Sequence, residues 1–138
     1  MIDRLTALDT NILLRFVLHD DAALAAAARR LIENNQCSVS LLAVAELGYV
    51  LVSFYRAKLP DVLAACRTLL ALPTLEFEYE SRLTAALDGV EAGVDWFDAL
   101  LWAATPPGVA LATFDKAFAK RAATLGWNVQ VRLPKAGK

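Results

Sequence analysis

The stretch LTALDTNIL, residues 5–13, predicts a short apolar strand that ends in an acid and leads straight into a helix. Leu5–Leu8 is the strand, Asp9 and the two polar residues after it supply turn and capping chemistry, and Ile12 begins a helix that runs to about Leu18. Strands that alternate with helices make an α/β fold, and such folds gather their sites at the carboxyl ends of the strands. The stretch therefore predicts both a fold class and a place for a site.

The rest of the chain repeats this alternation. Period-two or fully apolar runs predict strands, while proline, glycine and capping residues mark the ends of helices. The pattern indicates a mostly parallel sheet with helices on both faces, in a single domain that we expect to span residues 1–138 with a loose tail at 134–138. Strands are predicted at 37–40, 75–79, 109–113 and 129–133, and helices at 22–33, 42–54, 60–72, 81–91, 96–104 and 116–125.

Composition excludes several classes of protein. The hydrophobic content of 57% is high, yet the apolar runs are broken before the roughly 18–20 residues that span a bilayer, and the first residues lack a signal-peptide pattern. We therefore expect a cytoplasmic protein. Cys37 and Cys66 lack the spacing of a zinc site or a disulfide framework and are expected in the core. A net charge of −1 neither favours nor excludes nucleic acid as a partner.

Four carboxylates stand in apolar sequence surroundings: Asp9, Glu46, Asp98 and Asp115. Glu46 is the most informative, because the residues three and four positions away on its predicted helix are apolar and indicate a face turned away from water. A buried carboxylate is costly unless a positive charge offsets it. A divalent metal ion shared among these acids is the economical explanation, and metal with several carboxylates points to phosphoryl-transfer chemistry.

The four acids can meet at one end of the predicted sheet. Asp9 and Asp115 each follow a strand, while Glu46 and Asp98 come from the first turns of helices. Simpler interpretations stay open, because Asp9 and Asp115 also suit helix N-caps and Glu46 suits a solvated surface. Asp95 lies one turn before Asp98, and we favour Asp95 as the cap and an occasional metal ligand, with Asp98 as the primary ligand.

Other catalytic arrangements find no support in the sequence. His19 is the only histidine, and no serine or cysteine stands in a nucleophile-elbow motif, which argues against a Ser-His-Asp or Cys-His hydrolase. Neither GxxxxGK[ST] nor GxGxxG occurs, so the usual nucleotide-binding loops are absent. A phosphoaspartate enzyme with Asp9 as nucleophile would usually offer a second aspartate two positions later, where Asn11 stands.

Four motifs, taken in order, resemble those of PIN-domain ribonucleases, and most closely those of VapC-type toxins of toxin–antitoxin pairs. They are Leu8–Leu13, the single Glu46, Gly93–Leu101 and Thr113–Lys116, and the resemblance extends over residues 5–133. It implies a three-layer α/β/α fold, a magnesium- or manganese-dependent endoribonuclease activity, RNA as the substrate and an antitoxin protein as a partner.

The resemblance also assigns residues to the site. One departure from the family pattern concerns Pro106–Gly108, which shortens the segment between Asp98 and Asp115 relative to the usual helix and loop. The acidic quartet is matched by Asp9, Glu46, Asp98 and Asp115, and polar positions that steady it are matched by Asn11 and Thr113.

Basic side chains close in sequence to the acids are candidates to hold the RNA backbone, with a solvated helix face as their alternative interpretation. These candidates are Arg15, Lys116, Lys120 and Arg121.

The apolar content exceeds what one core of this size needs, and we expect the surplus on helices 22–32 and 59–72. We therefore expect a homodimer with an apolar groove for an antitoxin helix. The rival hypothesis is a non-catalytic PIN-like module that binds RNA or protein, and the presence of all four acids argues against it.

Overall fold

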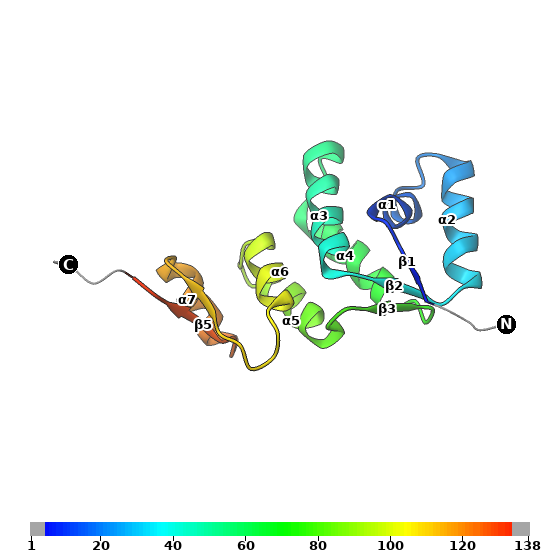
Figure 1. Ribbon diagram of the computed structural model, residues 1–138. Helices are drawn as coiled ribbons and strands as arrows, with labels where there is room; N and C mark the ends of the chain where they lie inside the picture. The colour runs from blue at the N-terminus through cyan, green and yellow to red at the C-terminus, as the bar shows by residue number, and fades with distance from the viewer. Residues whose placement is uncertain (1–4, 134–138) are drawn as a thin grey trace. The chain divides into compact units, whose positions relative to one another are not determined.

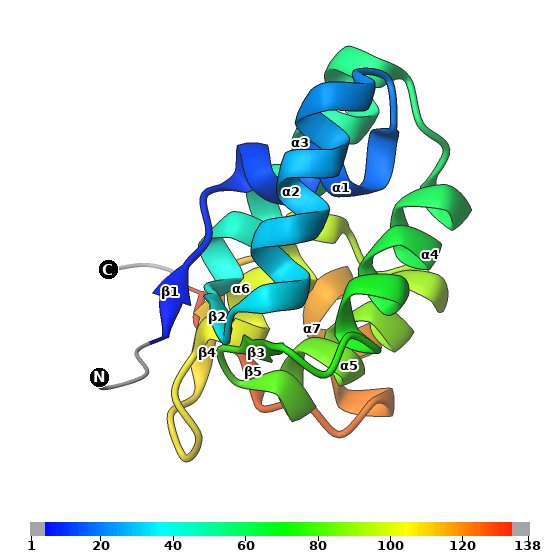
Figure 2. The same ribbon diagram turned by 90° about the vertical axis from the view of Figure 1, so that its right-hand side faces the viewer.

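The computed structural model describes residues 5–133, which divide into two compact units, one up to Glu80 and the other from Ser81. Figure 1 labels the helices and strands other than β4, which is labelled in Figure 2. The first unit contains β1 (Thr6–Ala7), α1 (Thr10–Leu18), α2 (Ala22–Asn34), β2 (Cys37–Val39), α3 (Leu41–Tyr55), α4 (Leu59–Leu70) and β3 (Leu75–Phe77). The boundary falls at the start of α5 (Glu80–Glu91), and the second unit continues with α6 (Trp96–Ala104), β4 (Leu111–Thr113), α7 (Lys116–Thr124) and β5 (Val129–Val131).

The predicted alternation of strands and helices is confirmed, with every observed end within two residues of its expected position. The described strands all pair in parallel, which confirms the α/β class. All five strands are shorter than expected, because the hydrophobic pattern extends beyond the residues that find a ladder partner. The tail predicted at 134–138 lies outside the described residues.

The sheet of the first unit has the order β1-β2-β3. Cys37 and Val39 point into the core with their neighbours on β3, whereas the row Ala7–Ser38–Glu76 lies on the opposite face of the sheet. Helices α1, α2 and α3 lie on one side of the strands (Figures 1 and 2), and α1 packs against both α2 and α3. Both cysteines are buried, as predicted.

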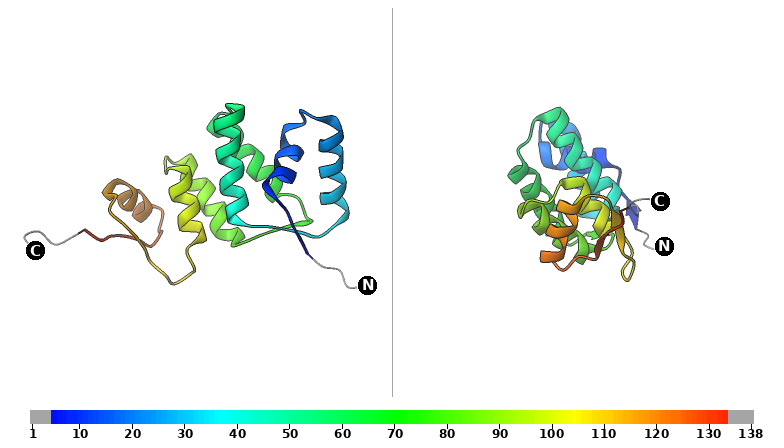
Figure 3. Two further views of the ribbon diagram at one scale, coloured as in Figure 1. Left: turned by 45° about the horizontal axis from the view of Figure 1, so that its top comes forward. Right: turned by 90° about the vertical axis from the view of Figure 1, so that its left-hand side faces the viewer.

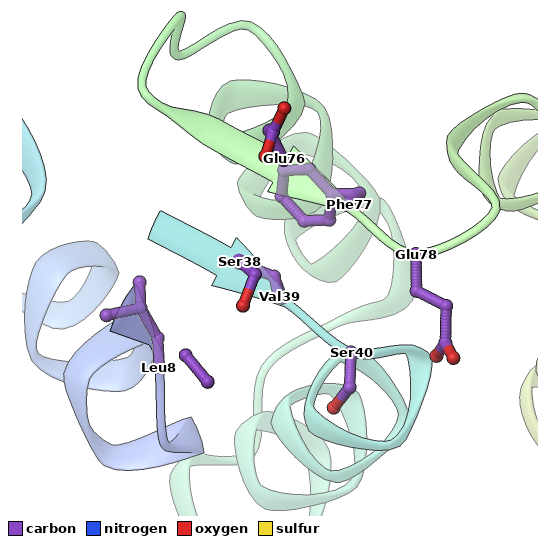
Figure 4. A pocket seen from close by; sticks show the side chains of 8 residues that line it. Leu8, Ser38, Val39, Ser40, Glu76, Phe77 and Glu78 are labelled. Atoms are coloured by element: carbon purple, nitrogen blue, oxygen red, sulfur yellow. The ribbon is translucent and has the colours of Figure 1, made fainter. Parts of the chain in front are cut away.

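A hollow of about 380 Å³ lies at the carboxyl ends of these strands (Figure 4). Ser40 and Glu78, which line it, both hold the start of α3: the Leu41 N–H donates to Glu78 Oε1 at 2.9 Å, and the Ala43 N–H donates to Ser40 Oγ at 3.1 Å. These bonds satisfy amide groups that have no partner within the helix. The hollow therefore marks where β2 turns into the helix that carries Glu46.

The second unit pairs β4 with β5 and packs α7 against β5 (Figure 3). Its core contains two stacked indoles, Trp102 and Trp127, with ring centroids 4.0 Å apart and an angle of 5° between the ring planes. The Arg82 guanidinium lies 4.1 Å from the centroid of the Trp102 ring and donates to the carbonyl oxygen of the same residue at 3.0 Å. Gly89 allows this packing, because a Cβ there would collide with the Trp127 ring.

Exposed apolar side chains occur on α2 and α4, where we expected a surplus: Leu24 is 46% and Leu59 41% exposed. A larger set, which lies on α3, was not predicted. The most exposed large apolar side chains of the first unit belong to it, with Leu42 79% and Phe54 72% exposed. The alanines of α2 add little surface each, whereas α3 is apolar around its whole circumference and can bury only one stripe. Among residues 5–133, no helix is long and apolar enough to cross a bilayer.

Candidate active site

Three aspartates of the second unit surround a small hollow of about 170 Å³, here called the acidic hollow. Asp95 and Asp98 come from the beginning of α6, and Asp115 comes from the beginning of α7. The other residues that line it are Gly93, Val94, Ala117, Phe118 and Arg121. Two helix N-termini thus face one space, and their partial positive charges favour anionic groups there.

Asp98 is the half-buried member of this group. Burial raises the pKa of its carboxyl above the ordinary value of 3.8, and the negative charges of Asp95 and Asp115 raise it further. Asp95 and Asp115 therefore lie close enough to Asp98 for their charges to act on its carboxyl. The shortened segment at Pro106–Gly108 therefore does not keep Asp115 away from Asp98.

A stability change with pH follows from this pKa shift. Because the folded state binds the Asp98 proton more tightly than the unfolded state does, stability falls as pH rises from 3.8 through the raised pKa. In EDTA, we expect Asp98→Asn to melt at a higher temperature than the parent chain at pH 7, with the advantage disappearing below the ordinary aspartate pKa. Thermal unfolding followed by circular dichroism at pH 7 and pH 3.5 tests this, and a parent chain that is the more stable at pH 7 would contradict it.

Both flanking aspartates also cap their helices. Asp95 Oδ2 accepts from the backbone N–H groups of Phe97 and Asp98, each at 3.1 Å, so the predicted cap is confirmed. Asp115 Oδ1 accepts from the Phe118 N–H at 3.0 Å, and the Asp115 N–H donates to Thr113 Oγ1 at 3.0 Å. Asp115 is thus the N-cap of α7, and the Thr113 hydroxyl accepts a hydrogen bond within the turn that precedes it. Each cap engages one carboxylate oxygen, and both residues also line the acidic hollow.

Asp9 and Glu46 belong to the first unit. Asp9 occupies the N-cap position of α1, but its side chain makes no capping hydrogen bond there. The neighbouring Thr10 is buried, and its hydroxyl donates to the carbonyl oxygen of Ala43 at 3.4 Å. Ala43 lies one turn before Glu46 on α3, so the start of α1 and the Glu46 turn of α3 are held together. The structure thus places two of the four predicted acids in each unit.

The expectation that these acids are buried is wrong for three of them: Asp9, Glu46 and Asp115 are exposed. Glu46 does have apolar neighbours, as the sequence indicates, but Leu42 and Tyr49 are themselves 79% and 48% exposed. Most of the buried stripe of α3 lies on the other side of the helix, and its residues are Leu41, Ala43, Val44, Leu47, Gly48 and Leu51. In a helix that is apolar all round, the identity of the neighbours does not reveal which face is buried.

The basic candidates occupy different environments. Arg15 Nη1 donates to both carboxylate oxygens of Asp20, at 3.0 and 3.3 Å, and so pairs with an acid outside the candidate site. Lys116, Lys120 and Arg121 are all exposed on α7, and of the three only Arg121 lines the acidic hollow. Asn11 is exposed in the first turn of α1.

Sequence reasoning missed two residues that organise this region. Thr10 joins α1 to α3, and the only signal for it is its place beside Asp9. Glu78 directly follows β3 and its carboxylate holds the start of α3, but the predicted strand 75–79 enclosed it, so the rule on carboxyl ends of strands did not single it out. Within residues 5–133, no three His, Cys, Asp or Glu side chains form a group able to hold a metal ion.

The sequence profile of the PIN domain family matches residues 6–123. The chain therefore belongs to the PIN-domain family, and its α/β fold is the predicted one. PIN domains are generally nucleases that act on nucleic acid with divalent metal ions. No curated protein and no solved structure matches the chain significantly.

Proposed function

We propose that this PIN domain is a Mg²⁺- or Mn²⁺-dependent endoribonuclease that hydrolyses RNA phosphodiesters in the cytoplasm as the toxin of a toxin–antitoxin pair. The metal ligands in this proposal are Asp9, Glu46, Asp98 and Asp115, with Asp95 beside them. The observation that carries it is the convergence of Asp95, Asp98 and Asp115 on the acidic hollow, with the Asp98 pKa raised by its neighbours. Membership of the PIN family supports the class of reaction.

The chemistry of the donor atoms suits a hard divalent cation, although no three acids of residues 5–133 are placed as a group that could hold one in this structure. Mg²⁺ prefers carboxylate oxygens and water, and the caps at Asp95 and Asp115 each leave one carboxylate oxygen for such a contact. A bound cation would also offset the negative charges of Asp95 and Asp115 that raise the pKa of Asp98, which is a second reason why the site suits a cation. When bound, the metal would supply an activated water and charge stabilisation at phosphorus.

The chain's own residues have separate tasks in this mechanism. The caps fix the first turns of α6 and α7, so that the Asp98 and Asp115 carboxylates are held in place before substrate arrives. Asp9, whose side chain makes no capping bond, is available as a ligand in the first unit, and the Thr10 bond to Ala43 keeps it near the turn that carries Glu46.

The test is cleavage of a single-stranded RNA by the purified protein with Mg²⁺, with Mn²⁺ and with EDTA. We expect products only with metal, and the product ends report hydrolysis of the phosphodiester. A folded protein that leaves RNA intact in every metal would contradict the proposal and favour the non-catalytic PIN-like module.

We further propose that the chain is a homodimer and that α3 supplies the contact. Five large apolar side chains of this helix are at least 41% exposed, and exposed apolar surface of this kind is typical of protein–protein contacts. An antitoxin helix would bind as a separate partner, its apolar face in a groove of the toxin. The five side chains are Leu42, Tyr49, Val52, Phe54 and Tyr55.

Replacing one of these apolar side chains by an acid should separate the protomers. Phe54 is 72% exposed, so Phe54→Glu costs little in the folded monomer but buries a charge in a dimer. Light scattering at micromolar concentration should give a dimer for the parent chain and a monomer for Phe54→Glu. Leu24→Glu, at a 46% exposed position on α2, is the matched control and should stay dimeric. A monomeric parent chain would count against the dimer.

A further inference from the structure

Arg121 shares the acidic hollow with Asp95, Asp98 and Asp115. Within the described residues, it is the one cationic side chain of the hollow's lining. Three acids alone would repel a polyanion such as RNA, so a cation built into the same wall alters what the hollow can accept.

The Arg121 guanidinium is held at the wall by the chain itself. Its Nη1 donates to the carbonyl oxygen of Ala92 at 3.4 Å, just after the end of α5. The guanidinium also lies over Gly93, where a Cβ would collide with the same Nη1 atom. Gly93 has a φ of +112°, a backbone conformation that residues other than glycine rarely adopt. The glycine therefore makes room for the exposed Arg121 side chain beside the hollow, and the bond to Ala92 tethers it there.

Helix geometry separates Arg121 from the two lysines of α7. Ala117, Phe118 and Arg121 line the hollow and are spaced three and four residues apart, so they share one face of the helix. Lys116 and Lys120 each precede a member of this stripe by one residue, which rotates them by about 100° around the helix axis. Arg15, the remaining candidate, pairs with Asp20.

We propose that Arg121 binds a phosphate of the RNA strand next to the phosphate that is cut, and so sets substrate affinity. The inference rests on the proposed ribonuclease function. A guanidinium presents several N–H donors in a planar fork that matches two phosphate oxygens, and the bond to Ala92 occupies only Nη1. Arg121 thus helps to bind the RNA strand, whereas the carboxylates take part in the reaction at the phosphate that is cut.

The experiment measures binding of a labelled single-stranded RNA by fluorescence anisotropy, in the Asp98→Asn background so that no cleavage interferes. Adding Arg121→Gln should weaken binding about tenfold, as loss of a hydrogen bond to a charged group does. It should also reduce the slope of log affinity against log salt by about 0.7, the value for one phosphate contact on a single strand. Arg121→Lys should restore the slope but only part of the affinity, because the charge is kept and the fork is lost.

Arg30→Gln is the matched control, because Arg30 is exposed on α2 and its substitution removes the same charge away from the hollow. If Arg121→Gln behaves like Arg30→Gln in both affinity and slope, Arg121 only ties α7 to the end of α5 and the proposal is overturned, whatever happens to the melting temperature. Absence of RNA binding would overturn it as well. An Arg121-dependent affinity in a chain that never cuts RNA would sustain this contact while refuting the cleavage proposal.

Discussion

Asp98→Asn is expected to lower metal-dependent RNA cleavage by at least about 100-fold, the usual loss when one charged group of an active site is removed. Asparagine keeps the shape of the side chain but loses the charge that binds a cation. The fold should survive, because the substitution removes a carboxylate that burial and two neighbouring acids already disfavour. Initial rates of RNA cleavage at saturating Mg²⁺ give the measurement, with circular dichroism as the check on folding.

Asp95→Asn provides the sharper comparison, because it separates a cap from a ligand. The Asp95 carboxylate accepts two backbone bonds at the start of α6, and an asparagine oxygen can accept the same bonds. The loss of activity should therefore be smaller than for Asp98→Asn. The reverse order would mean that Asp95 is the primary ligand.

Asp61→Asn controls for the removal of an exposed acid near a helix start, because Asp61 lies in the first turn of α4. Its activity should equal that of the parent chain. Full activity in purified Asp98→Asn would sink the assignment of the site.

Mn²⁺ at millimolar concentration is expected to raise the melting temperature, because a ligand that binds only the folded state stabilises it by mass action. At 100 times the dissociation constant the gain is about 2.7 kcal/mol, or roughly 10 °C for a domain of this size. Both Asp9→Asn and Asp98→Asn should lose most of this gain, although their acids come from different units. Differential scanning calorimetry with Mn²⁺ and with EDTA measures it.

The two variants answer different questions in this measurement. Asp98→Asn tests the acidic hollow, and Asp9→Asn tests whether the first unit supplies ligands to the same ion. Asp61→Asn should keep the full rise in melting temperature. If Asp9→Asn also keeps it, Asp9 is no ligand and the acids of the second unit bind the ion without it. A parent chain indifferent to Mn²⁺ would refute the metal site altogether.

The sequence by itself determined the order and type of the elements and the residues worth testing. Local signals suffice for this, because capping groups, prolines and hydrophobic periodicity act over one or two turns. Asp95 as the cap of α6 follows from such a signal, and so does Asp115 directly after β4. Membership of the PIN family agrees with the motif order that the sequence presents.

Only the tertiary structure decided which faces are buried and which charges share a space. Glu46 stands among apolar residues in sequence, yet its side of α3 is exposed, since burial depends on the elements that pack against a helix. Arg15 and Arg121 look equivalent in sequence, but one pairs with Asp20 and the other lies over Gly93 in the acidic hollow. Such differences arise from contacts between residues far apart in the chain, and a local pattern carries no information about them.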